Sequence, residues 1–215
     1  IGACQYSDMT IFSFHPVKTI TTGEGGAITT NNEALYNKLK LLSSHGMTKD
    51  ETILTKNDGP WYYEMHSLGF NYRITDFQAA LGITQLQKLD SFIEKRRMLV
   101  TEYHKAFAND ERFSLLEEQP YSKSAYHLCP LLIDFSKVTI SKKDLFIKLR
   151  DKGLFLQVHY VPIHLQPFYK QFGFKEGDFP KAEKYYQKTL SLPLYPLLEK
   201  DDIKNIVKII KETAQ

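Results

Sequence analysis

The sequence lacks several features that would assign the chain to a special class of protein. No stretch approaches the ~20 consecutive apolar residues of a membrane span, and the first residues lack the pattern of a signal peptide. The 215 residues include two cysteines, Cys4 and Cys129, which form no C-x-x-C motif, so we expect both to be reduced. The net charge of +3 comes from scattered lysines, which give no basic footprint for nucleic acid. We therefore expect a cytoplasmic protein that binds neither membrane nor nucleic acid.

The composition that remains is that of an ordinary globular protein. Hydrophobic residues make up 42% and charged residues 25% of the chain, which excludes disordered and collagen-like classes. The length allows one large domain or two small ones. The chain begins with Ile1 and its opening looks like the middle of a domain, so we expect a fragment of a longer protein.

The most informative stretch is F-S-F-H-P-V-K-T-I-T-T-G-E-G-G-A-I-T-T, at residues 12–30. The run 9–14 predicts a buried strand and 27–30 predicts a second strand, with Lys18 between them. A desolvated lysine can lose its proton and attack a carbonyl to form a Schiff base. A solvated loop lysine is the commoner case. The Ser13 hydroxyl, which could hold a phosphate, and the glycines downstream favour the reactive alternative.

A second stretch, G-F-N-Y-R-I-T-D-F-Q-A-A-L-G, covers residues 69–82. Thr75 and Gln78 predict a capping box, and the apolar spacing beyond them predicts a single long helix from about residue 75 to 108. Judged by residue type alone, Asn71 is a turn residue and Arg73 a surface charge. In the preceding loop, 46–63, the aromatic residues 61–63 either pack on neighbouring structure or line a ligand pocket.

The polar segment 109–123 predicts a domain boundary near residue 110, so that domains of 1–110 and 111–215 are expected. Beyond it we expect a small α+β domain. Its predicted strands cover 127–133 and 155–161, and its predicted helices cover 141–152, 180–190 and 201–213.

A third stretch, H-Y-V-P-I-H, carries His159, Tyr160 and His164. Two histidines could suggest a metal, but no H-E-x-x-H helix exists and Pro162 interrupts the spacing, so we expect no metal site. The alternatives are that these side chains contact a substrate or that they pack their strand against the larger domain.

The three stretches together resemble the DegT/DnrJ/EryC1/StrS family of sugar aminotransferases, which use pyridoxal phosphate. The resemblance rests on S-F-H-P-V-K, N-x-R-x-x-x-x-x-A-A-x-G and V-H-Y-x-P-x-H and covers essentially the whole chain, but only the C-terminal part of the family's length. It implies an α/β fold, the C-terminal part of a fold-type I aminotransferase. Residues 1–110 would end the large cofactor-binding domain, including a long interdomain helix, and 111–215 would form the small α+β domain.

The resemblance also implies roles for individual residues. Lys18 would be the catalytic residue that forms the Schiff base, and Ser13 and Asn71 would bind the cofactor phosphate. In the family the asparagine reaches the neighbouring subunit's cofactor, which implies a homodimer with shared active sites. Tyr160, His164 and His159 would contact the substrate. The aspartate that pairs with the cofactor's ring nitrogen in the family is not in this sequence.

The implied activity is transfer of an amino group, from L-glutamate, to C4 of a UDP-linked 4-keto-6-deoxy sugar. The phrases Q-V-H-Y-x-P-I and S-H-G-M-x-K are most similar to family members of pseudaminic acid biosynthesis, which supplies flagellin glycosylation. Three alternatives stay open: amination of another UDP- or dTDP-linked sugar, a non-catalytic fragment, and a nucleotide-binding loop at T-G-E-G-G. That loop matches neither the P-loop nor the G-x-G-x-x-G pattern.

Overall fold

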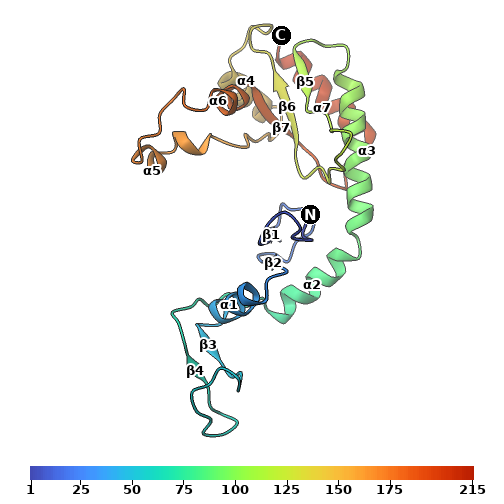
Figure 1. Ribbon diagram of the computed structural model, residues 1–215. Helices are drawn as coiled ribbons and strands as arrows, with labels where there is room; N and C mark the ends of the chain where they lie inside the picture. Colours follow the sequence, from blue (N-terminus) through green and yellow to red (C-terminus); the bar gives the residue numbers. More distant parts are fainter. The chain divides into compact units, whose positions relative to one another are not determined.

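The computed structural model describes all 215 residues, which divide into two compact units, Ile1–Leu89 and Asp90–Gln215 (Figure 1). The division falls before the boundary expected near residue 110. The reason is that the helix that begins at Leu89 contributes its apolar face to the core of the second unit.

The first unit begins with two paired strands and a helix. Strand β1 (Thr10–Ser13) and strand β2 (Gly26–Thr29) are antiparallel, and α1 (Glu33–Ser43) begins after an Asn32 cap. Both strands lie close to the predicted positions. The expected burial of β1 is wrong, because Ile11 is 77% exposed. Successive side chains of a strand point to opposite faces of the sheet, and no second layer covers these faces in the two-stranded sheet.

The segment expected to be a loop contains a short hairpin, formed by β3 (Met47–Thr48) and β4 (Glu64–Met65). The predicted long helix is wrong. Helix α2 (Asp76–Leu86) and helix α3 (Leu89–Phe107) are separated by a turn. In that turn the Lys88 N–H donates to the Gln85 carbonyl three residues back, and this tighter bonding breaks the α-helical ladder. The apolar spacing continues across the turn, so the periodicity of the sequence does not reveal the break between the two helices.

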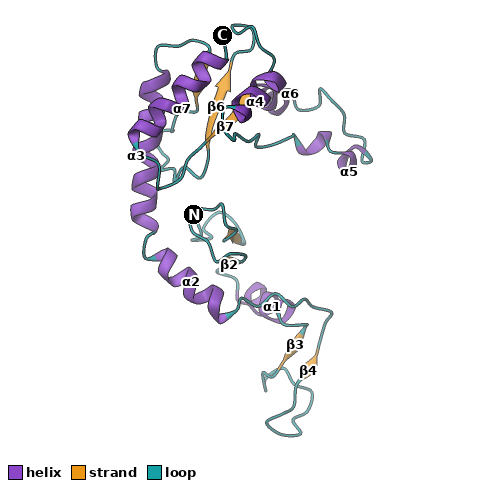
Figure 2. Ribbon diagram, turned by 180° about the vertical axis from the view of Figure 1, so that it is seen from behind, coloured by secondary structure: helices purple, strands orange, loops and turns teal.

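The second unit is built on a three-stranded antiparallel sheet in the order β5 (Phe113–Leu115), β6 (Cys129–Ile133), β7 (Thr189–Leu192). Three further helices pack with α3 around it: α4 (Lys142–Asp151), α6 (Pro180–Lys188) and α7 (Lys200–Thr213). Figure 2 shows α3 and α7 side by side, as Figure 1 does from the opposite direction. Two short turns of helix, η1 (Ile163–Leu165) and α5 (Pro167–Lys170), lie on the connection to α6.

Three expectations for this unit need correction. Residues 155–161 form no strand, because they meet β7 only through the single bridge between Gln157 and Ser191. The helix expected over 180–190 ends at Lys188, and the next residues form β7. Strand β5 lies inside the expected linker. Each difference arises from pairing with β6 or β7, which are distant in sequence.

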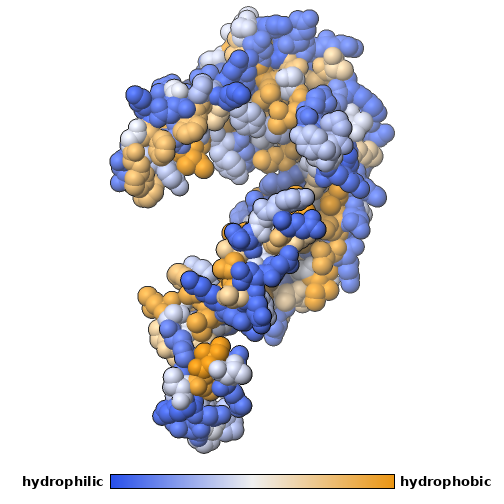
Figure 3. All heavy atoms as spheres, in the orientation of Figure 1, coloured by the Kyte–Doolittle hydropathy of each residue, from blue (hydrophilic) through white to orange (hydrophobic).

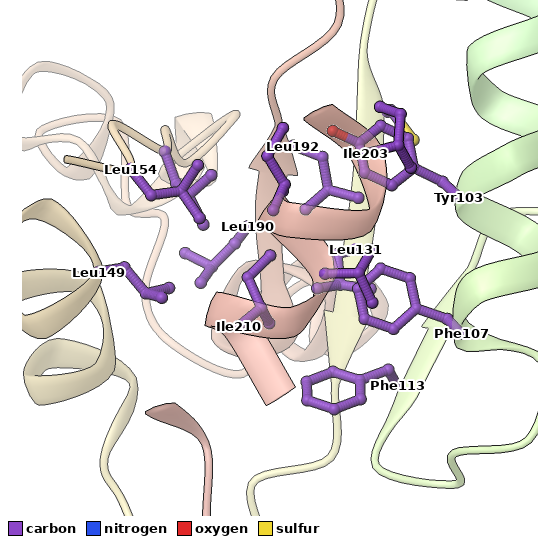
Figure 4. Close-up of a cluster of buried hydrophobic side chains, with 14 of the residues drawn as sticks. Tyr103, Phe107, Phe113, Leu131, Leu149, Leu154, Leu190, Leu192, Ile203 and Ile210 are labelled. Carbon is purple, nitrogen blue, oxygen red and sulfur yellow. The ribbon is translucent and has the colours of Figure 1, made fainter. Parts of the chain in front are cut away.

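The hydrophobic core lies entirely within the second unit. Every buried apolar side chain falls between Leu99 and Ala214. Figure 4 shows residues of α3, the sheet, α4 and α7 pointing toward one another, with Leu131 near the centre. The Tyr103 hydroxyl, which reaches this core from α3, donates to the Pro193 carbonyl at 2.9 Å.

The first unit has no buried apolar side chain. Apolar surface shows along α2 and beside the β3–β4 hairpin in Figure 3, and over α5 in the second unit. No helix of the chain is both long and apolar enough to cross a membrane.

Candidate active site

Lys18 lies on a tight turn at the end of β1. Its backbone N–H donates to the His15 carbonyl at 2.9 Å. The chain before and after the turn is fastened by bonds from Phe14 N–H to the Gly25 carbonyl and from Thr22 N–H to the Phe14 carbonyl. The Lys18 side chain is half-buried and enters none of the ion pairs of the chain. The fold therefore presents a primary amine on a fixed turn, with no carboxylate paired to it.

The two glycines after this turn have little space for a side chain, and Gly25 also has a φ of +154°. A Cβ added to Gly26 would lie 2.6 Å from the Phe12 carbonyl oxygen, and one added to Gly25 would lie 2.4 Å from the Thr22 hydroxyl. The Ser13 hydroxyl, which precedes Lys18, is exposed and accepts only a long bond of 3.4 Å from the His15 N–H. It can still donate to a ligand oxygen.

Helix α2 is tied to the glycine loop by Gln78. The predicted capping box is confirmed: the Gln78 side-chain oxygen accepts from the Thr75 N–H at 2.9 Å, and Thr75 accepts from the Gln78 N–H. The Gln78 side-chain nitrogen also donates to the Glu24 carbonyl at 2.9 Å. Sequence reasoning identified the cap but missed this second bond, which has no local signal.

Asn71 lies on the segment 69–72, which crosses the C-terminal end of α1 and is called the strap below. The Phe70 N–H donates to the Leu42 carbonyl at 2.7 Å, and the Tyr72 N–H donates to the Ser43 carbonyl at 2.9 Å. These carbonyls are among the last four of the helix, which have no partner within it. The Asn71 side chain is exposed and available to a ligand.

The strap lies so close to α1 that only glycine fits at two places. A Cβ on Gly69 would lie 2.2 Å from the Gly46 nitrogen, and one on Gly46 would lie 1.8 Å from the Ser67 carbonyl oxygen. Gly46 also has a φ of +69°, a conformation that other residues rarely adopt. The two glycines therefore fix the position of the strap.

A cavity of about 950 Å³ opens elsewhere in the first unit, between the strands, α1 and residues 72–74. Its lining is dominated by apolar side chains and includes none of Ser13, Lys18 and Asn71. The cavity therefore lies over the uncovered apolar face of the β1–β2 pair and is separate from the Lys18 amine.

His159 and Tyr160 belong to the second unit, on the segment that runs past β7. The Ser191 N–H donates to the Gln157 carbonyl at 2.7 Å, and the His159 Nδ1 is 2.8 Å from the Ser191 hydroxyl. The Tyr160 ring meets the His159 ring edge-on at 4.6 Å and is 67% exposed. Tyr160 is thus free to contact a ligand, while His159 anchors the segment.

His164 lies in a different environment, because it is buried. Its Nε2 is 2.7 Å from a Glu183 carboxylate oxygen, and its ring packs against Phe179 at 4.8 Å. Glu183 also accepts from the Gly177 and Phe179 N–H groups. The geometry gives His164 a role in fastening η1 to α6. Sequence reasoning missed Glu183, which lies nineteen residues away.

These bonds hold the pKa of Glu183 below its ordinary value. The hydrogen bond from His164 is the largest cause, and the backbone N–H groups of Gly177 and Phe179 add to it. The carboxylate is therefore charged at neutral pH and acts as the acceptor toward His164 Nε2.

The predicted site residues thus fall into two sets. Ser13, Lys18 and Asn71 lie in the first unit, with Ser13 and Lys18 on one strand end, and His159, Tyr160 and His164 lie in the second. No group of three or more His, Cys, Asp or Glu side chains is arranged to hold a metal ion.

Comparison with known proteins gives the family. Residues 2–211 match the model of the DegT/DnrJ/EryC1/StrS aminotransferase family. The Campylobacter jejuni (serotype O:23/36) UDP-4-amino-4,6-dideoxy-N-acetyl-beta-L-altrosamine transaminase is 40% identical over 207 residues, which cover 96% of this chain and 51% of that protein.

Solved structures agree with this match. Helicobacter pylori PseC, an aminotransferase involved in the biosynthesis of pseudoaminic acid, has a TM-score of 0.86 at 34% identity, covering 97% of this chain and 54% of that one. A putative sugar aminotransferase from Streptococcus pneumoniae, in its PLP form, has a TM-score of 0.86 at 28% identity, covering 99% and 53%. The chain spans about half the length of the relatives it matches, and the predicted fold, part of an α/β aminotransferase, is confirmed.

Proposed function

Because the chain belongs to the DegT/DnrJ/EryC1/StrS aminotransferase family, we propose that it acts as a pyridoxal phosphate-dependent sugar aminotransferase. The proposed reaction moves an amino group from L-glutamate to C4 of a UDP-linked 4-keto-6-deoxy sugar. The name of its C. jejuni relative contains a UDP-linked 4-amino-4,6-dideoxy sugar, which is the aminated form of such a substrate. The observation that carries the proposal is the half-buried amine of Lys18 on its fixed turn, within a match that covers nearly the whole chain.

The residues present fit the cofactor. An aldehyde needs a primary amine without a carboxylate partner, which Lys18 provides, and a phosphate needs donors, which the exposed Ser13 hydroxyl and Asn71 amide provide. Pyridoxal phosphate, when bound, supplies the electron sink that stabilises negative charge at the α-carbon of the amino donor. Lys18 would hold it covalently. Ser13 would bind its phosphate from the same strand end, and Asn71 from the neighbouring subunit of a homodimer.

Once released as a free amine, Lys18 has a second role. Its Nζ would accept the proton from the donor's α-carbon and deliver it to the reacting carbon of the cofactor, as general base and then general acid. Tyr160 has an exposed ring and hydroxyl that suit a sugar contact. We place the activity in the cytoplasm, in a pseudaminic acid-type pathway of the kind that serves flagellin glycosylation.

A labelling experiment tests the proposal. The chain is mixed with pyridoxal phosphate, reduced with borohydride and mapped by peptide mass. We expect one pyridoxyl label, on Lys18, which is lost in Lys18→Ala and retained in Lys38→Ala, an exposed lysine of α1. With a UDP-linked 4-keto sugar and glutamate, Lys18→Ala should lower the rate by about 10²–10⁴-fold. Labels spread over several lysines, or none, would contradict the proposal.

One observation favours a second candidate, a chain that keeps the fold without transamination. All buried apolar side chains lie in the second unit, so the unit with Lys18 has no core of its own to hold the site rigid. The same labelling experiment separates the two candidates, since a non-catalytic chain would give no selective label on Lys18.

A further inference from the structure

Tyr160 lies between two histidines that are held by hydrogen bonds, although its own ring is open to solvent. On one side the His159 Nδ1 is 2.8 Å from the Ser191 hydroxyl. On the other side the buried His164 has its Nε2 2.7 Å from the Glu183 carboxylate. Because the segment is fixed on both sides of Tyr160, this side chain can present its hydroxyl to a ligand with less loss of conformational entropy than one on a free loop.

Both anchors come from one continuous stretch of the second unit. Glu183 belongs to α6, and Ser191 belongs to β7, which begins directly after α6 ends at Lys188. Strand β7 pairs with β6, and all four of its residues are buried. The position of the Tyr160 segment, which forms no strand of its own, is therefore set by the sheet and its adjoining helix.

Ser191 holds the segment through two different bonds. Its N–H donates to the Gln157 carbonyl at 2.7 Å, and its hydroxyl bonds to His159 Nδ1 at 2.8 Å. Ser191 is buried, so little water competes for the hydroxyl. The His159 ring then meets the Tyr160 ring edge-on at 4.6 Å. The backbone bond fixes the path of the chain, while the hydroxyl fixes the ring against which Tyr160 rests.

The chain directly after Ser191 is fastened to α3. The Arg96 Nη1 donates to the Leu194 carbonyl at 2.9 Å, and the Tyr103 hydroxyl donates to the Pro193 carbonyl at 2.9 Å. Both α3 side chains are buried. The end of β7 therefore cannot shift without breaking buried hydrogen bonds, and Ser191 is a rigid support for His159.

We infer that Ser191 is a positioning residue for the sugar substrate: its hydroxyl fixes the His159 ring, and this ring holds Tyr160 where its hydroxyl meets the sugar. The identity of the substrate rests on the proposed function, whereas the bond from Ser191 to His159 and the exposure of Tyr160 do not. Ser191 acts through these two residues on substrate binding and has no part in the proton transfer at Lys18. The expected signature is a raised KM for the sugar at an unchanged kcat.

Steady-state kinetics of the 215-residue chain with pyridoxal phosphate, glutamate and a UDP-linked 4-keto sugar test the inference. Ser191→Ala keeps the backbone bond to Gln157 and removes the hydroxyl. The KM for the sugar should rise about five- to tenfold, the effect of losing one hydrogen bond, while kcat and the KM for glutamate stay unchanged. Ser191→Thr retains the hydroxyl and should bring the KM back toward its original value. Ser114→Ala, at an exposed position of β5 in the same sheet, should change nothing.

A double-mutant cycle distinguishes positioning from a general loss of stability. If Ser191 acts through Tyr160, Ser191→Ala should add little to the KM effect of Tyr160→Phe, whereas independent effects multiply. Urea unfolding shows whether Ser191→Ala is folded under assay conditions. If it is not, Ser191→Cys takes its place, with a smaller rise in KM expected because a thiol is a weak donor. Equal KM values for Ser191→Ala and Ser114→Ala, effects that multiply, or a lowered kcat at an unchanged KM would each overturn the inference.

Binding without turnover separates this inference from the proposed function. The affinity for the keto sugar is measured by calorimetry in Lys18→Ala chains with and without Ser191→Ala, beside the Lys18 label described above. A selective label with equal affinities leaves the aminotransferase proposal standing and removes the role of Ser191. An affinity that falls in Ser191→Ala, without a label on Lys18 in the unaltered chain, supports the role of Ser191 and contradicts the activity. No binding of the sugar to a chain with Ser191 intact would overturn the inference.

Discussion

At the scale of single residues, the same residue types have different roles according to what lies beside them. The exposed Tyr160 and the buried His164 are four positions apart, yet one is open to a ligand and the other is bonded to Glu183. The carboxylates Glu64 and Glu183 each collect several donors and each organise a loop. Positioning by buried or half-buried carboxylates is therefore used in both units.

The Glu183 cluster predicts a pH dependence of stability. The folded pKa of Glu183 is lowered, so its contribution is fully present above the ordinary pKa of about 4.3 and is lost as the pH falls through the lowered folded value. Glu183→Gln should destabilise the second unit at pH 7 and flatten the loss of stability toward pH 3, measured by urea unfolding. Glu176→Gln, an exposed neighbour, is the matched control. Identical pH profiles for the two variants would contradict the role of the cluster.

At the scale of elements, short segments are fastened by a few bonds between distant backbones. Helix α2 reaches the glycine loop through Gln78, and the strap with Asn71 reaches α1 through the Leu42 and Ser43 carbonyls. The segment with Tyr160 reaches β7 through Ser191. The candidate residues are thus carried by elements that lack an apolar core around them or lie at its edge.

Gln78 provides a test of such a link. Gln78→Glu keeps the oxygen that caps α2 but replaces the N–H that donates to the Glu24 carbonyl with a second acceptor. We expect amide exchange of Thr22 and Gly23 to rise about tenfold, as expected for the loss of roughly one hydrogen bond. Exchange within α2 should stay the same. Gln87→Glu, just beyond the helix end, should leave the loop unchanged, and equal loop exchange in both variants would refute the link.

At the scale of the whole molecule, the two units differ in how they are stabilised. The second unit contains every buried apolar side chain, and the first contains none. Burial of apolar surface is the main favourable contribution to folding, so the second unit has the means to fold by itself and the first does not.

This difference predicts the behaviour of the separate parts. Residues 90–215 alone should unfold cooperatively, and Leu131→Ala within them should cost about 2–5 kcal/mol, because Leu131 is fully buried. Ile147→Ala, at a position that is 46% exposed, should cost much less. The free energy of unfolding of both variants is measured by urea unfolding, monitored by circular dichroism. A gradual transition without a midpoint would show that the core depends on the first unit.

The sequence by itself determined the features whose causes lie within a few residues. The cap at Thr75 was predicted and found, because a cap bonds the backbone two or three positions ahead. The helix over 201–213 followed from its apolar spacing and is present as α7. The resemblance that gave the family also rests on short contiguous motifs and is confirmed over residues 2–211.

Only the tertiary structure decided what depends on distant partners. Strand β7 exists because it pairs with β6, some sixty residues earlier in the chain, while residues 155–161 form a single bridge rather than a strand. His164 became a buried anchor because Glu183 lies beside it. Lys49, Trp61 and Arg73 meet at one cavity through the hairpin and the strap. Such contacts join residues far apart in the chain, and neither propensity nor periodicity contains that information.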